Sequence, residues 1–153
     1  MNIVQKHSGV LKNLEKLEQT NHSLRRRILG TEKGRVMYNS TILKNILMND
    51  YKVPSVSMSD STYWVQKWDV WKNIIAYDWI DKKKYVSELF DCDDFAFWFG
   101  SRMAGIYHLN TGFVCYGDTY NMDGTKRSGH AFNIIPAYTD GELNWYVYEP
   151  IND

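Results

Sequence analysis

Residues 91–105 read DCDDFAFWFGSRMAG, and this stretch decides the fold class that the sequence predicts. Its apolar side chains, Phe95 and Phe99 among them, fall on nearly every side of a helical projection. A helix of this kind belongs in the interior of a domain. Asp91 is a suitable N-cap and Gly105 a suitable C-terminal stop, so we expect a central helix between them.

After this helix the apolar residues alternate with a period of two, which is typical of strands. The expected strands cover residues 112–116, 130–135 and 143–148. Asp140-Gly141 is a residue pair favoured in two-residue hairpin turns, so the last two strands should pair antiparallel. With Asp140 and Gly141 as the two turn residues, residue 139 pairs with residue 142, and the numbers of all paired residues sum to 281.

The first thirty residues predict a helix that ends at Gly30. It carries a stripe of heptad positions, spaced alternately by four and three residues: Val10, Leu14, Leu17, Asn21, Leu24 and Ile28. One interpretation is a helix packed on its own domain. The other is a short coiled coil that makes a homo-oligomer through residues 10–28, with Asn21 fixing the register. Both interpretations remain open at this point.

Two more helices are expected before the central one. The first covers residues 40–49, and the second begins near Asp60 and carries a stripe of apolar residues: Trp64, Trp68, Trp71 and Ile75. Core packing is the main interpretation of this stripe, and an aromatic shelf for a sugar or peptide is the alternative. Helices followed by antiparallel strands make an α+β protein, with the central helix packed on the sheet.

Size, charge and cysteine content exclude several classes of protein. The 153 residues, 18.0 kDa in mass, correspond to a single domain over residues 1–153. Residues 91–153 carry three basic and nine acidic side chains, which argues against a nucleic-acid site there. Two cysteines indicate no disulfide framework, and no zinc-ligand spacing is present. With no apolar membrane span and no signal peptide, we expect a cytoplasmic protein without a membrane partner, with export by another route left open.

Cys92 is the first candidate for chemistry. It falls in the first turn of the central helix, where free backbone N–H groups and the helix dipole favour an anion such as a thiolate. The acidic neighbours Asp91, Asp93 and Asp94 oppose this effect. A base is therefore needed to form the thiolate, and without one Cys92 would be an inert, buried thiol.

His130 and Glu149 complete a possible catalytic set. His130 is expected to open a strand beside Gly129, where it could take a proton from a thiol. In the register that sums to 281, Glu149 is the diagonal neighbour of His130 on the same face. Glu149 could then accept a hydrogen bond from one imidazole nitrogen and leave the other for Cys92. A register shifted by one residue would put the two side chains on opposite faces.

Three blocks resemble the Cys, His and acid blocks of the papain-like superfamily, in an order similar to the transglutaminase-like cysteine peptidases: residues 91–96 (DCDDFA), 129–133 (GHAFN) and 148–150 (YEP). Glu in third place is most like the papain-like protease domain of certain chimeric fungal lectins, and domains of bacteria and their phages have similar blocks. The resemblance covers residues 85–153. It implies a papain-like (transglutaminase-like) fold, with a catalytic core over 85–153.

The resemblance also implies an activity, that of a cysteine hydrolase, a peptidase or amidase, with a Cys92–His130–Glu149 triad acting on a peptide or amide substrate. In this superfamily a backbone N–H and an upstream polar side chain usually hold the oxyanion, and Gln66 and Asn73 are candidates here. No cofactor is expected; calcium at Asp93 and Asp94 is the alternative to a capping and solvated role. A non-catalytic binding or assembly module and a peptidoglycan-cutting enzyme are the alternative functions.

Overall fold

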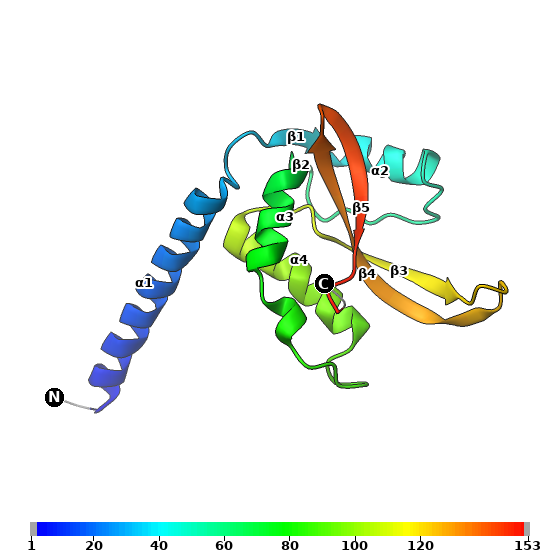
Figure 1. The fold of residues 1–153 in the computed structure, drawn as a ribbon. Helices are drawn as coiled ribbons and strands as arrows, with labels where there is room; N and C mark the ends of the chain where they lie inside the picture. The colour runs from blue at the N-terminus through cyan, green and yellow to red at the C-terminus, as the bar shows by residue number, and fades with distance from the viewer. Residues whose placement is uncertain (1–2, 152–153) are drawn as a thin grey trace.

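The structure, a computed structural model, describes the backbone of residues 3–151 and the side chains of residues 11–151 (Figure 1). Its central element is helix α4, Cys92–Tyr107, with Asp91 as the N-cap as predicted. The helix continues two residues beyond Gly105, so the predicted C-terminal stop is wrong. The added turn buries Ile106 and Tyr107.

Four further helical segments precede α4, and their bounds are α1 Ile3–Leu29, α2 Ser40–Asn49, α3 Trp68–Tyr77 and the short 3-10 helix η1 Ile80–Lys82. The predictions for α1 and α2 are confirmed. Gly30 has φ of 69°, a left-handed conformation that suits glycine and ends α1. In Figure 1, α1 projects away from the body of the molecule, to which only its C-terminal end is joined.

Five strands form the sheet: β1 Val36–Asn39, β2 Thr62–Lys67, β3 Phe113–Tyr120, β4 Lys126–Thr139 and β5 Glu142–Tyr148. The long strand β4 pairs antiparallel with β3 through its first part and with β5 through its last part. It also makes a short parallel contact with β2, which continues antiparallel to β1. The protein is therefore α+β as predicted, but its sheet is mixed and not purely antiparallel.

The expected helix from residue 60 is wrong in its first part, because residues 62–67 form β2. Tyr63 and Val65 alternate as buried side chains, which is the period of a strand, and β-branched and aromatic residues favour one. Trp64 therefore belongs to a strand, and the helix begins only at Trp68. Core packing is confirmed for Trp71, which is fully buried.

The hairpin between β4 and β5 has the predicted turn. Asp140 and Gly141 both have positive φ, 55° and 87°, as a two-residue turn of the twisted type requires. The pairs run from Asn133↔Tyr148 to Thr139↔Glu142, so the register that sums to 281 is confirmed.

One hydrophobic core joins the elements before and after residue 85. Its buried members come from α3, η1, α4, the segment after α4, β4 and β5: Trp71, Ile74, Ile80, Phe95, Phe99, Met103, Ile106, Tyr107, Leu109, Ile135, Ala137 and Tyr148. The segment 85–153 thus shares its core with α3 and η1. Among the described residues, no helix combines the length and apolar character that crossing a bilayer requires.

A buried ion pair ties the end of α3 to α4. Asp78 is 3% exposed, and Arg102 Nε donates to its two carboxylate oxygens at 3.1 and 3.0 Å. We expect Arg102→Met to lower the free energy of unfolding by about 3 kcal/mol or more, because it leaves a buried carboxylate without its cation. Urea unfolding measures this loss. Lys72→Met, which removes an exposed pair with Asp69, is the control and should have little effect; equal losses would contradict the assignment.

Candidate active site

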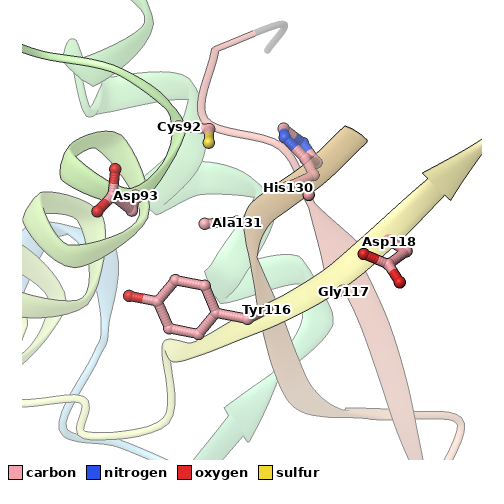
Figure 2. A pocket seen from close by; sticks show the side chains of 8 residues that line it. Cys92, Asp93, Tyr116, Gly117, Asp118, His130 and Ala131 are labelled. Atoms are coloured by element: carbon pink, nitrogen blue, oxygen red, sulfur yellow. The ribbon is translucent and has the colours of Figure 1, made fainter. Parts of the chain in front are cut away.

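An open pocket of about 500 Å³ lies between the N-terminus of α4 and the β3–β4 hairpin (Figure 2). Its lining comes from three elements: Cys92 and Asp93 of α4, Tyr116, Gly117 and Asp118 of β3, and Gly129, His130 and Ala131 of β4. Segments far apart in the sequence therefore bring the predicted thiol and the predicted imidazole to one place.

Cys92 is the first residue of α4 and is half-buried. As predicted, it lies where the backbone N–H groups of a helix have no partner within the helix. In Figure 2 the Cys92 sulfur and the His130 ring lie on the same side of the pocket. The two side chains line the same pocket, and no hydrogen bond joins them in the described part of the chain.

His130 is held by the predicted third residue. Its Nε2 hydrogen-bonds Glu149 Oε2, and both side chains are about a quarter exposed. Glu149 Oε1 also accepts from the backbone N–H of Ile151 at 3.4 Å, which helps to fix the carboxylate. With Nε2 engaged, a neutral His130 carries its proton on Nε2 and leaves Nδ1 as a free acceptor.

The place of His130 in its strand differs from the prediction. The strand does not begin at His130 but at Lys126, and Gly117 of β3 is its directly paired residue. The β3–β4 hairpin extends further because residues 121–124 make the turn: Thr125 N donates to Asp123 Oδ1 at 2.9 Å, and Gly124 has φ of 83°. His130 therefore lies within the part of β4 that pairs with β3 and not at the start of the strand.

A buried amide joins α4 to the strand that carries His130. Asn133 is fully buried, and its Nδ2 donates to Ala96 O at 3.0 Å and to Phe113 O at 3.3 Å. Since Ala96 is one turn beyond Cys92, this contact fixes the start of α4 relative to β3 and β4. The role of Asn133 was not predicted, because only its position in a buried strand could be inferred from the alternation.

Carboxyl groups surround Cys92 as the sequence indicated. A hydrogen bond with Asp93 lowers the pKa of Asp91, and the same contact, burial and the charges of Asp91 and Asp94 raise the pKa of Asp93. Asp94 Oδ2 accepts from Asp91 N at 3.2 Å, so its capping role is confirmed. Negative charge beside the thiol therefore makes a nearby base more important.

Metal binding was considered for Asp93 and Asp94. In the structure Asp91, Cys92 and Asp93 each offer a ligand atom, and these atoms lie within 4.8 Å of one another. Calcium takes six to eight oxygen ligands, and this set supplies two carboxylates and a sulfur. The donor set does not fit a resident calcium ion.

The predicted oxyanion donors do not reach the pocket. Gln66 is fully buried on β2, where its Nε2 donates to Thr31 O and Lys33 O at 3.0 and 2.9 Å and its Oε1 accepts from Lys67 N. These bonds use the whole amide to hold the loop after α1, so the Gln66 prediction is wrong. Asn73 is exposed on α3 and does not line the pocket.

Tyr116 is a member of the pocket that the sequence did not single out. Figure 2 shows its ring across the pocket, with the hydroxyl on the side of Asp93. Burial and the negative charges at Asp93 and Cys92 raise the pKa of Tyr116, so its hydroxyl stays protonated at neutral pH. The sequence signal that could have pointed to Tyr116 as a pocket residue is its position at the end of the expected strand 112–116.

A second and larger cavity adjoins this pocket. Its volume is about 740 Å³, and it lies between the loop 53–60 and the side chains of α4 and β3, with Phe97 and Val114 in its lining. Tyr116 lines both cavities, and its ring meets that of Phe97 edge to face at 6.3 Å. An extended ligand in the Cys92 pocket could therefore continue into an apolar groove.

The chain matches no protein-family model and no curated protein. Among solved structures it is similar to one titled "PSL1a-E64 complex", with 21% sequence identity and a TM-score of 0.51. The match covers 76% of this chain and 45% of that one, so the chain spans less than half the length of the protein it resembles. At this identity the likeness concerns the fold alone, an α+β arrangement of helices on a mixed sheet.

The two thiols should differ in reactivity. Burial raises the pKa of Cys115 to about 11, so roughly one Cys115 in ten thousand is a thiolate at pH 7. Cys92 lies instead at a helix N-terminus in an open pocket with an imidazole. We expect iodoacetamide to alkylate Cys92 much faster than Cys115, and the rate at Cys115 to rise about tenfold per pH unit up to its pKa. Peptide mass mapping measures both rates, and equal, slow alkylation would contradict a reactive Cys92.

Proposed function

We propose that the chain is a cysteine hydrolase, a peptidase or amidase of papain-like fold, which acts by acyl transfer through Cys92, His130 and Glu149. The observation that carries this proposal is the hydrogen bond between His130 Nε2 and Glu149, which leaves Nδ1 without that partner, in a side chain that lines the same pocket as Cys92. A nucleophile, a base and a group that orients the base are the parts that such a reaction needs.

In the first step His130 Nδ1 takes the proton of the Cys92 thiol, and Sγ attacks the carbonyl carbon of an amide. A carbon–sulfur bond forms while the carbon–nitrogen bond breaks, and His130 passes the proton to the departing amine. Glu149 stabilises the imidazolium that forms between the two proton transfers. The product of this step is a thioester on Cys92 and a free amine.

In the second step water, or another amine, attacks the thioester. His130 takes a proton from the attacking group and returns it to the sulfur as the carbon–sulfur bond breaks. Attack by water gives a carboxylic acid and completes hydrolysis. Attack by an amine would complete transamidation, so the acceptor decides between the two outcomes.

The oxyanion of each step needs hydrogen-bond donors close to the sulfur. The backbone N–H of Cys92, in the first turn of α4, is one candidate. The Tyr116 hydroxyl is the second candidate, because it lines the same pocket and remains protonated at neutral pH. Tyr116 takes the role in this proposal that Gln66 and Asn73 do not fill.

The proposed substrate is a peptide or another amide, and no cofactor, nucleic acid or membrane is part of the proposal. A chain that reaches from the Cys92 pocket into the neighbouring cavity would bring an apolar segment past Tyr116. The second candidate function is a non-catalytic binding or assembly module of the same fold. It is favoured by the absence of a hydrogen bond between Cys92 and His130 among the described residues.

The activity itself is the main test. We expect the chain to cleave members of a fluorogenic peptide-amide library and to react with E64, a thiol-directed epoxide, at Cys92. Cys92→Ser should abolish both, while Cys115→Ser, the matched control for loss of a thiol, should retain them. Glu149→Gln should lower kcat about 10²–10⁴-fold with little effect on KM, because the imidazole loses its orienting charge. Wild-type turnover in Cys92→Ser, or no turnover and no preferential labelling of Cys92, would contradict the proposal.

Gly129 allows a separate test of substrate access. A Cβ placed on Gly129 would meet no atom within 4 Å, although the residue lines the pocket. Gly129→Ala should therefore leave the thermal unfolding midpoint unchanged and raise KM several-fold, since the methyl group occupies space left for the substrate. Gly105→Ala adds the same methyl group on α4 without any contact and is the control. Unchanged KM in both variants would show that the substrate does not pass over Gly129.

A further inference from the structure

The heptad stripe of α1 is not covered by the rest of the chain. Its members with described side chains are Leu14, Leu17, Asn21, Leu24 and Ile28, and the four apolar ones are exposed by 52%, 66%, 49% and 76%. Asn21 is exposed as well. Val10 lies outside the residues whose side chains the structure describes. The interpretation that this stripe packs on its own domain is therefore wrong for positions 14–28.

A different face of α1 holds the helix to the body. The half-buried side chains of its last two turns are His22, Arg25, Arg26 and Leu29. Arg26 Nη1 donates to Ile106 O at 2.9 Å, and Leu29 packs against the core. At 3.6 residues per turn, this face and the stripe are centred about 110° apart around the helix. The stripe is thus free to meet another molecule while α1 stays attached to its own body.

The outer part of α1 needs a partner to account for its stability. Residues 11–20 are all exposed, so nothing in the described part of the chain packs against them. Most of the stability of a helix in water comes from burial of its apolar face. A row of exposed leucines along a projecting helix is therefore what one helix of a coiled coil shows without its partner helix.

We propose that α1 pairs with α1 of a second copy of this chain in a parallel, in-register, two-stranded coiled coil. Asn21 points to a second copy as the partner. An amide within an apolar seam is costly unless it meets another hydrogen-bonding group, and in this arrangement Asn21 meets Asn21 of the second copy.

The parallel orientation follows from the same residue. In the heptad repeat Asn21 occupies position a, and Leu17 and Leu24 occupy position d. In an antiparallel pair each a position faces a d position, so Asn21 would face an apolar residue such as Leu17 or Leu24. The parallel pair also avoids like charges beside the seam. Across it, Asn13 lies near Glu18 of the second copy and Thr20 lies near Arg25 of the second copy.

The dimer would carry its two bodies at the same end of the coiled coil. Each body follows the C-terminal end of α1 and lies to the side of the stripe, so twofold symmetry places the bodies on opposite flanks. All residues that line the Cys92 pocket come from one chain. The dimer therefore brings two complete sites together without changing either of them, and the proposal does not depend on the catalytic one.

Light scattering on the full chain tests the association. We expect twice the 18.0 kDa chain mass, with dissociation on dilution. Leu17→Glu/Leu24→Glu should raise the dimer dissociation constant at least about a hundredfold, because it places charges in the seam. Gln19→Glu/Ser23→Glu, on the opposite side of α1, adds the same charge and should remain dimeric. A wild-type chain of single mass at every concentration, a higher oligomer, or equal dissociation of both variants would overturn the proposal.

Disulfide trapping tests the orientation. Leu17→Cys, which keeps Asn21 in place, should form a disulfide between copies under mild oxidation, because facing d positions in a parallel pair lie within disulfide reach. The wild-type chain under the same conditions controls for cross-links through Cys92 and Cys115. An interchain disulfide that forms between Leu17→Cys chains and either Asn21→Cys or Ile28→Cys chains, but not between two Leu17→Cys chains, would overturn the parallel arrangement.

Discussion

The two-residue turn at Asp140-Gly141 is the constraint on which the sheet and the site both depend. It fixes the β4–β5 register, and this register places Ile135, Ala137 and Tyr148 on the face that packs against α4. The same register sets Glu149 diagonal to His130 on the other face. A slip of one residue would turn Tyr148 out of the core and separate Glu149 from His130, so the burial of the core protects the geometry of the site.

Elements with one dominant local signal could be predicted from the sequence. The helix at Cys92 has an acidic N-cap and apolar residues on nearly every side, and the hairpin has a turn that glycine and aspartate favour. Strand parity then gave the His130–Glu149 neighbours without any coordinates, because parity depends only on the turn length. These are local or nearly local relations, for which the residue pattern is sufficient.

Relations that depend on tertiary contacts could not be predicted. In β2 the buried side chains of Tyr63 and Val65 alternate with Trp64, as in a strand. Trp64 also lies at a helical spacing from Trp68 and Trp71, so the sequence fits a helix as well. Only burial against the sheet decides between the two. Gln66 is a candidate oxyanion donor from the sequence as a polar residue upstream of Cys92, and its actual role could not be predicted because its backbone partners around Lys33 are remote in the sequence. The approach of Cys92 to His130 also depends on a tertiary contact that the sequence pattern does not show. Ala131 is buried on the face of β4 that packs against α4, so alternation along the strand would point its neighbour His130 away from the helix. We attribute the pocket that Cys92 and His130 share to the twist of β4 past the end of the helix.

The acidic surroundings of Cys92 explain why Glu149, the acid of the proposed triad, would matter in this protein. Asp91 and Asp93 interact so strongly that the pKa of one is lowered and that of the other is raised, and both carboxyl groups lie beside the sulfur. A thiolate formed there gains from the helix N-terminus and loses to these charges. An imidazolium in the same pocket would compensate this loss, and Glu149, bound to Nε2 of the ring, would stabilise that cation. Glu149 would thus favour the thiolate through His130, while Asp91 and Asp93, which lie beside the sulfur, oppose it.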